Sequence, residues 1–303
     1  MVDAGGGAWV MEGLRLQLGA RTLLTIPRRL MGVGLSLDQA LAGEVPALPS
    51  LPPGHHGWML RSLPDGATIA ASGPRFVRQH YRRHYVDLAA GEAAWRAAMS
   101  ASTRATLRRK AKRIESRAGA TCRIERYRTA EEMMLFHPLA RQVAALTYQE
   151  RLLGSALPAD AGFVARMLRL AAADGARGWL LFLGDTPVAY LWCSAEGSAW
   201  RYDHVGHDPA HAPLSPGTVL MEAALVDLFA DRLPRFDFTE GEGQHKSSFA
   251  THAVACHDML LLRPGPTNHA ALALLRGFDA GVAIGKQAST AAWLRPIVRR
   301  LRR

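Results

Sequence analysis

Three apolar segments that follow one another within residues 178–206 constrain the fold of this chain more than any other feature. The segments GWLLFL, VAYLWCSA and AWRYDHVG are separated only by the turn sequences GDTP and EGS. Segments of this length, rich in aromatic and aliphatic residues and joined by glycine-containing turns, are typical of neighbouring antiparallel strands. We therefore predict a three-stranded meander over residues 178–206.

The chain leaves this meander through a loop that contains proline and glycine. The sequence APLSPGTVLMEAALVDLFADR holds this loop and then an apolar helix, which we expect to begin near Thr218. A short strand, RFDFT, is predicted at 235–239, and a last strand, CHDMLLLR, at 256–263. The predicted order is three strands, a loop and helix, and two further strands with a polar loop between them.

Helices are predicted before the meander. Segment 101–118 repeats apolar residues at spacings of four, three and four, which indicates a helix with one apolar face and a basic remainder. These apolar positions are Leu107, Ala111, Ile114 and Ala118. The sequence TAEE at Thr129 is a capping box and predicts a second helix that reaches about residue 151. A third helix is predicted over 159–174.

The first part of the chain reads as β structure followed by a linker. Residues 13–26 alternate apolar and polar side chains around Leu18-Gly19-Ala20, which predicts a hairpin. Residues 43–57 contain four prolines and three glycines, as a loop or linker does. A short strand is predicted at 84–89.

Composition indicates a globular protein in a reducing compartment. The chain has 303 residues, of which 49% are hydrophobic, enough for a packed core. The first residues lack the charged leader and apolar run of a signal peptide, and eighteen apolar residues never run together. The three cysteines form no CxxC pair, so we expect reduced thiols. We predict a cytoplasmic protein.

Two segments hold the whole positive excess. The net charge is +11; residues 101–118 carry seven basic side chains against one glutamate, and residues 289–303 carry five arginines and no acid. Any contact with a polyanion, a membrane or an acidic protein is therefore expected at these segments. The first is a solvated amphipathic helix, a dock for an anionic carrier, or a nucleic-acid contact. The second is an amphipathic helix that packs on the domain or lies on an anionic membrane.

Titratable side chains gather immediately after the predicted strand at 235–239. Asp237 alternates with two phenylalanines, and Glu240, Glu242, His245 and Lys246 follow within nine residues. Glycines at 241 and 243 indicate a turn, so the charges either form a site or are merely solvated.

The order of elements resembles the GNAT acyltransferase fold, and residues 75–263 resemble its CelD-like branch, named for an association with cellulose biosynthesis. Three motifs carry the resemblance: STRATLRRKAKRI, LSPGTVLMEAAL and FDFTEGEGQHKSSF. The last matches a pattern of Phe-Asp-Phe, a Gly-acid pair, an aromatic-Lys pair and a nearby Phe, with His245 where the branch usually has tyrosine. The resemblance implies a mixed α/β (α+β) fold with a mostly antiparallel central sheet flanked by helices. We expect an N-terminal β-hairpin region and linker at 1–74, the GNAT-like domain at 75–263 and a basic helical tail at 264–303.

The resemblance also implies an activity and a donor site. It implies transfer of an acyl group from a thioester, acyl-CoA or an acyl carrier protein, to an amine or hydroxyl of a small molecule or of a lipid or polysaccharide precursor. Such enzymes hold the pyrophosphate of coenzyme A on backbone N–H groups of the loop and helix after the central strand. Here the matching residues are Ser215, Pro216, Gly217 and Thr218, although no Arg/Gln-x-x-Gly-x-Gly/Ala run is present. Arg108 and Arg109 are candidates for holding an anionic carrier.

Acyl transfer needs a group that takes a proton and a donor for the oxyanion. The candidates are Asp237, Glu240, His245, Lys246 and, in the meander, His204. Asp203 and His204 are adjacent in a predicted strand, so strict alternation would place them on opposite faces. We expect the stretch from 237 to 246 to share one cleft with the end of the strand at 203–207.

Metal chemistry is not expected. His252, Cys256 and His257 in HAVACH have no second ligand cluster at zinc-like spacing. Trp179, Trp192 and Trp200 fit sheet packing better than base stacking. Two alternatives remain open: a FemAB-like transferase that uses aminoacyl-tRNA, and a non-catalytic GNAT-like module that binds nucleic acid or membrane.

Overall fold

The three apolar segments form neighbouring antiparallel strands, as predicted. They are β6 (Ala176–Leu183), β7 (Thr186–Glu196) and β8 (Ala199–His207). The computed structural model describes residues 9–18, 21–117, 121–147, 157–241 and 243–290. Within β6 and β7 both faces are apolar, because each face is covered by helices.

One ten-stranded sheet organises the described chain, in the order β1-β2-β3-β10-β4-β9-β8-β7-β6-β5. Its neighbours are antiparallel except for the pairs β2–β3 and β8–β9, which are parallel. The remaining strands are β1 (Trp9–Leu18), β2 (Arg21–Gly34), β3 (Gly57–Pro64), β4 (Arg75–Asp87), β5 (Cys122–Tyr127), β9 (Arg235–Asp237) and β10 (His252–Leu262). The predicted mixed α/β class with a mostly antiparallel sheet is confirmed.

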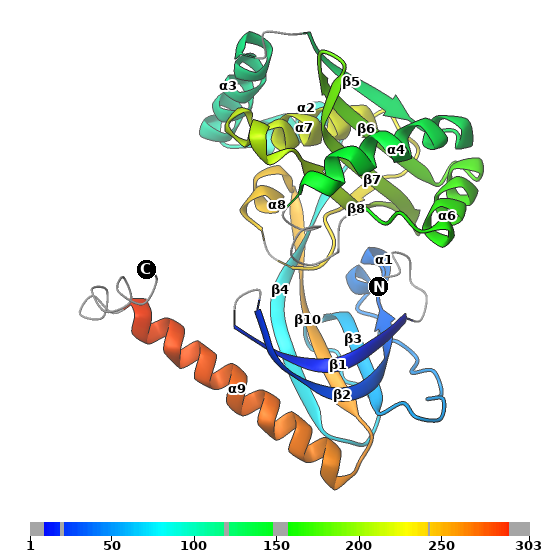
Figure 1. The fold of residues 1–303 in the computed structure, drawn as a ribbon, viewed down its shortest axis with the longest axis vertical. Helices are drawn as coiled ribbons and strands as arrows, with labels where there is room; N and C mark the ends of the chain where they lie inside the picture. Colours follow the sequence, from blue (N-terminus) through cyan, green and yellow to red (C-terminus); the bar gives the residue numbers. More distant parts are fainter. Residues whose placement is uncertain (1–8, 19–20, 118–120, 148–156, 242, 291–303) are drawn as a thin grey trace.

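Helices cover the sheet around the meander on both faces (Figure 1). Their bounds, with the 3-10 helix η1, are α1 (Leu37–Leu41), α2 (Gly91–Ala98), α3 (Ala101–Arg117), α4 (Ala130–Leu146), α6 (Ala161–Ala172), η1 (Pro209–Leu214), α7 (Pro216–Leu228), α8 (Gln244–Phe249) and α9 (Pro266–Thr290). Helices α2, α3 and α7 pack with Trp179 and Leu191 on one face. Helices α4 and α6 pack with Leu180 and Trp192 on the other.

Local sequence signals explain where the main helices begin. The capping box predicted at Thr129 is present, with Thr129 accepting from the backbone of Glu132 and the Glu132 side chain returning to the cap. The basic helix buries Leu107 and Ile114, which are 5% and 1% exposed, as the apolar spacing predicted. Its arginines and lysines occupy the remaining faces.

The two long strands β4 and β10 run side by side and connect the helix-covered part to a second part built on β1, β2 and β3 (Figure 1). The hairpin predicted at 13–26 is present and longer than expected, as β1 and β2. Helix α9 packs on this second part through Ala271, Leu272 and Leu275. The predicted domain boundary at residue 74 stays a prediction. Strands β3 and β4, which lie on its two sides in the sequence, both pair with β10, so one sheet continues across it.

Some elements were not predicted. Strand β3 lies directly after the proline-rich linker, α2 precedes the basic helix, and α8 begins at Gln244 inside the stretch read as a loop. Strand β4 is much longer than the predicted segment 84–89. The predicted tail at 289–303 lies almost wholly outside the described residues. None of the described helices combines the length and apolar character that a transmembrane span requires.

Candidate functional site

The parallel strands β8 and β9 separate soon after they meet. Their pairing runs from Ala199↔Arg235 to Arg201↔Asp237, and β9 ends there, whereas β8 continues to His207. Beyond Arg201, the edge of β8 that faces β9 has no ladder partner among the described strands. This separation leaves the edge of β8 over residues 203–207 open to an extended ligand, while its other edge stays paired with β7.

A pocket of about 610 Å³ opens at this separation. Its walls come from the end of β8, from η1, from the start of α7, and from single residues of α8 and the end of α4. The lining residues are Thr147, Tyr202, Val205, Gly206, His207, Pro209, Ala212, Ser215, Gly217, Thr218, Met221 and Phe249. The structure therefore places the donor residues predicted from the sequence, Ser215, Gly217 and Thr218, in the wall of one pocket.

The first turn of α7 faces this pocket with no side-chain cap. Ser215 precedes the helix in the left-handed region, with φ 57°, and Pro216 occupies a first-turn position. Thr218 and Val219 donate their N–H groups to the Ser215 carbonyl. A helix start of this kind is electropositive, because the helix dipole has its positive end there.

Lys110 of the basic helix adds a cation at the same place. Its Nζ lies 3.1 Å from Oγ1 of Thr218. Arg108 and Arg109, the residues chosen from the sequence, are exposed on α3. Lys110 was missed because the sequence shows that the helix is basic but not which turn of it meets α7.

A β-bulge in β8 overturns the predicted separation of Asp203 and His204. His204 stands opposite Trp192 and Tyr202 opposite Cys193, so Asp203 is an extra residue in the ladder. The Asp203 carboxylate accepts a hydrogen bond of 2.5 Å from Ser194, and the His204 ring lies 5.8 Å from the Trp192 ring. Since residues 192 and 194 of β7 share a face, Asp203 and His204 lie on the same face of the sheet.

The surroundings shift both pKa values. Burial raises the pKa of Asp203 to about 7, although Arg201 and Ser194 act in the opposite direction. Burial, together with the charges of Arg166 and Arg201, lowers the pKa of His204 to about 4. At neutral pH His204 is therefore an uncharged imidazole, packed edge-on against Phe163 at 5.5 Å.

Asp237 forms a buried ion pair. Its oxygens accept hydrogen bonds of 3.1 and 2.5 Å from Arg83 of β4, and the two side chains are 1% and 0% exposed. Arg83 also donates to the Leu35 carbonyl at 2.7 Å. Burial alone would raise the pKa of Asp237, but the charge and hydrogen bonds of Arg83 outweigh burial and hold that pKa below its usual value. Asp237 faces away from Phe236 and Phe238, which join the core on the other side.

This ion pair continues into a charged network around Arg201. Arg201 lies 3.2 Å from Glu196, 3.2 Å from Asp203 and 3.6 Å from Glu240. Glu240 is 22% exposed and is the most accessible acid of this group. Asp203 and Glu240 thus lie around one arginine close to Asp237, but their carboxylates do not line the pocket at 205–207, and the predicted shared cleft stays a prediction.

Lys246 holds the loop that follows β9. Its Nζ donates to the carbonyl of Glu240 at 2.7 Å and to that of Gly241 at 3.3 Å. The side chain is 8% exposed, and burial lowers its pKa while Glu240 and Asp237 act in the opposite direction. His245 lies in α8 with its side chain outside the described part of the structure, and Glu242 lies outside the described residues.

Tyr202 connects the pocket to the packed core. It lines the pocket and contacts the rings of Phe236 and Phe238 at 6.2 and 6.0 Å. Burial raises its pKa well above the usual range, so its hydroxyl stays protonated at neutral pH. No sequence signal distinguished this tyrosine from the others in the meander.

The three HAVACH residues do not form a common site. His252 stacks on Tyr85, and Cys256 packs with Tyr81 in a small buried cluster. His257 instead lies beside His80 of β4 and Asp65 of the turn after β3. The tryptophans of the meander, Trp179, Trp192 and Trp200, are at most 1% exposed and belong to the sheet core, as predicted.

Comparison with known proteins gives one match to a domain family and several similar solved structures. Residues 101–247 match the family described as acetyltransferase (GNAT) domain. These residues include the basic helix, the meander, the start of α8 and every pocket-lining residue except Phe249. A comparison with curated proteins gives no match.

Several solved structures are similar to the chain at low sequence identity. The C-terminal domain of a candidate lysylphosphatidylglycerol synthetase from Agrobacterium fabrum is 13% identical, with a TM-score of 0.53 over 88% of this chain and 84% of that one. L-PGS from Bacillus licheniformis is 13% identical, with a TM-score of 0.45 over 74% and 73%. FemX is 8% identical, with a TM-score of 0.46 over 85% and 89%. At 13% identity, the similarity to the Agrobacterium fabrum domain shows a shared fold and nothing further.

Proposed function

We propose that the protein transfers an acyl group from a carrier thioester to an amine or hydroxyl acceptor. One observation carries this proposal: the pocket opens where β8 and β9 separate, and its wall contains Ser215, Gly217 and Thr218. A GNAT acetyltransferase domain matches the same part of the chain, and such domains generally use acyl-CoA. An acyl carrier protein remains the other donor.

The proposed donor arrangement follows from the pocket walls. The carrier arm would lie along the edge of β8 that faces β9, where the backbone of 203–207 can pair with it. Its phosphates would meet the start of α7 and Lys110, which are both electropositive. Arg108 and Arg109, exposed on the same helix, would attract the carrier over longer range.

The proposed chemistry assigns each proton a destination. The acceptor nitrogen or oxygen attacks the thioester carbon, the carbon–sulfur bond breaks, and the thiolate takes a proton. Tyr202 keeps its proton at neutral pH, so it supports the proposal as the donor to the oxyanion or to the leaving sulfur.

The group that removes the acceptor proton is proposed to be Glu240 or His245. Glu240 is partly exposed beside Arg201, and His245 follows it in α8. Neutral His204 is the alternative base. Asp237 and Lys246 would position the loop between β9 and α8, since Asp237 also accepts from the Thr239 N–H at 2.9 Å.

The CelD-like branch is part of this proposal. Its three motifs fall on α3, on the start of α7, and on β9 with α8, and two of them meet where Lys110 contacts Thr218. The acceptor class is a small molecule or a lipid or polysaccharide precursor.

A second candidate is aminoacyl transfer of the FemAB kind, with tRNA as carrier. It is favoured by the exposed arginines of α3 and by the fold shared with the C-terminal domain of the candidate lysylphosphatidylglycerol synthetase. A non-catalytic module binding nucleic acid or membrane is the third. Buried acid-base groups around Arg201 favour catalysis, because a binding surface has no need of them. Membrane contact through 289–303 stays a prediction.

The test combines a thioester screen with one matched pair of variants. Purified protein is offered acyl-CoA, acyl carrier protein thioesters and aminoacyl-tRNA, and mass spectrometry detects the released carrier. For the active donor, Lys110→Met should raise KM about tenfold, the effect of losing one charged hydrogen bond. Lys112→Met removes the same charge from an exposed site of the same helix and should leave KM within about twofold. Equal effects of the two variants would contradict the proposed donor site, and an absence of turnover with all donors would contradict the transferase itself.

A further inference from the structure

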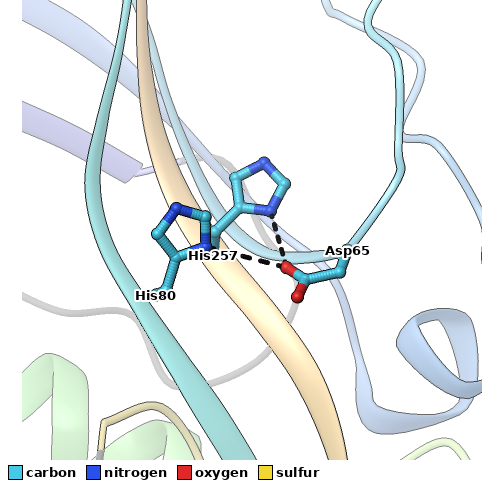
Figure 2. A group of neighbouring side chains, drawn as sticks. All are labelled: Asp65, His80 and His257. Atoms are coloured by element: carbon cyan, nitrogen blue, oxygen red, sulfur yellow. Dashed lines mark ion pairs between the residues drawn. The ribbon is translucent and has the colours of Figure 1, made fainter.

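Strands β4 and β10 and the turn after β3 bring two histidines and an aspartate together, outside the lining of the pocket (Figure 2). His257 of β10 stands directly opposite His80 of β4. On the other side of β10, Cys256 pairs with Pro64, the last residue of β3, and Asp65 follows it. The three side chains therefore meet across the order β3-β10-β4.

The ligand atoms of these side chains lie within 4.8 Å of one another. Nδ1 of His257 is 3.5 Å from Oδ1 of Asp65, and Nδ1 of His80 is 3.8 Å from the same oxygen. The His257 side chain is only 10% exposed, and its Nδ1 has no hydrogen-bond partner in the part of the chain that the structure describes. A buried ring nitrogen without a hydrogen bond, directed at a carboxylate, is an arrangement that a metal ion would satisfy.

The outer side of the group is open. The His80 and Asp65 side chains are 71% and 54% exposed, so water can complete a coordination shell. Asp65 is held in place by its N–H bond of 3.0 Å to the Ala255 carbonyl and by a turn in which Ala67 donates to the Pro64 carbonyl. His80 can rotate, because its side chain projects into solvent.

These distances suit a small divalent ion after a slight adjustment. Zn²⁺ binds imidazole nitrogen and carboxylate oxygen at about 2.0–2.2 Å, so tetrahedral ligands lie about 3.3–3.5 Å apart. The His257–Asp65 separation already meets this value, and rotation of His80 can close the rest. Two imidazoles and one carboxylate favour zinc and similar transition metals over Mg²⁺ and Ca²⁺, which prefer oxygen ligands.

We propose that Asp65, His80 and His257 bind one divalent transition-metal ion, for which Zn²⁺ is the best fit. The ion would join the turn after β3 to β4 and β10, at the strands that connect the two parts of the molecule (Figure 1). Cys256 takes no part, since alternation along β10 directs it to the opposite face, where it packs with Tyr81. The alternative is a simple ion pair between Asp65 and a protonated histidine.

The experiment is a calorimetric titration of the metal-stripped, tag-free protein with Zn²⁺, repeated with Mg²⁺ and Ca²⁺. We expect one Zn²⁺ per chain with micromolar or tighter affinity, and weaker binding of the two hard ions. His80→Ala, at an exposed position, should weaken Zn²⁺ binding at least about tenfold, because it removes one of three ligands. His252→Ala removes an exposed histidine of β10 that lies outside the group. This variant should bind Zn²⁺ as the wild type does.

Melting temperature gives an independent readout. Zn²⁺ in about hundredfold excess over Kd should raise the melting temperature of the wild type and of His252→Ala by about 5 °C, and that of His80→Ala by less. Co²⁺ absorption in the visible range should report nitrogen and oxygen ligation in the wild type. No one-to-one Zn²⁺ binding, or binding that His80→Ala and His252→Ala leave equally strong, would overturn the proposal.

Discussion

Replacing Asp237 with asparagine removes the negative charge that faces the fully buried Arg83 while keeping the size of the side chain. Asp237 accepts two hydrogen bonds from Arg83, at 3.1 and 2.5 Å, one on each carboxylate oxygen. Asparagine has only one oxygen that can accept, so one of these two hydrogen bonds is lost. Glu196, 3.8 Å from Arg83, would be its nearest remaining carboxylate. The change therefore leaves a buried cation partly uncompensated.

The magnitude follows from burial. Breaking a buried ion pair by removing one partner costs about 3–5 kcal/mol of unfolding free energy. Because Glu196 and the Leu35 carbonyl remain beside Arg83, we expect about 3 kcal/mol, the lower end of this range. The pKa of Asp237 is lowered in the folded state, so its stabilisation is present above the unfolded-state pKa and is lost as pH falls through the folded pKa. The difference between wild type and variant should shrink below about pH 4.

Urea unfolding followed by tryptophan fluorescence measures this, because Trp95, Trp179 and Trp200 are buried. The matched control is Glu92→Gln, which makes the same carboxylate-to-amide change in a surface pair with Arg96, where the side chains are 39% and 41% exposed. The control should cost less than about 1 kcal/mol. An Asp237→Asn variant as stable as this control would refute the assignment of a buried charge pair.

Three further changes test the site. His245→Phe should lower turnover at least about a hundredfold if His245 is the base, and His245→Tyr, which restores the usual residue of the CelD-like branch, should retain more activity; near-native turnover in both would exclude His245. Charge reversal at Arg108 and Arg109 should weaken binding of the carrier found in the screen in a salt-dependent way with little change in stability, and an affinity unchanged across salt would indicate a merely solvated face. Asp203→Asn should remove the proton that the wild type takes up on folding, because the pKa of Asp203 is about 7 in the folded state and lower in the unfolded state. The unfolding free energy of the wild type therefore falls as pH rises from about 4 to about 7. In urea unfolding, the variant should gain about 2–3 kcal/mol relative to the wild type between about pH 5 and pH 8. Parallel pH profiles of the two proteins would contradict the buried-carboxyl interpretation.

The sequence identified those elements whose apolar spacing repeats clearly. In the meander, Trp179 and Leu180 are both apolar because each faces a different helical layer, so the segment reads as a strand buried on both sides. In α3, Leu107 and Ile114 are buried as their spacing indicated. Pro216 and Gly217 identified the loop before α7, because proline and glycine indicate the start of a helix from the local sequence alone.

Features that depend on distant partners could not be read in this way. Strand β4 has the sequence RFVRQHYRRHYVD, whose charges suggest exposure, yet Arg83 is buried because its guanidinium pairs with Asp237 of the neighbouring strand β9. The bulge at Asp203 carries no glycine or proline, so alternation gave the wrong face for one of two adjacent residues. Lys110 became a candidate only once α3 was seen to meet α7.

Hydrogen exchange in the presence of the thioester carrier tests the proposed donor site most directly. Backbone amides are measured by mass spectrometry with and without a saturating, non-transferable analogue of the active donor. The account predicts slower exchange in residues 203–207, where β8 has no strand paired on the side of β9, and in 217–219 at the start of α7, with no change in β3. Unchanged exchange in both segments at saturation, or protection confined to other strands, would contradict it.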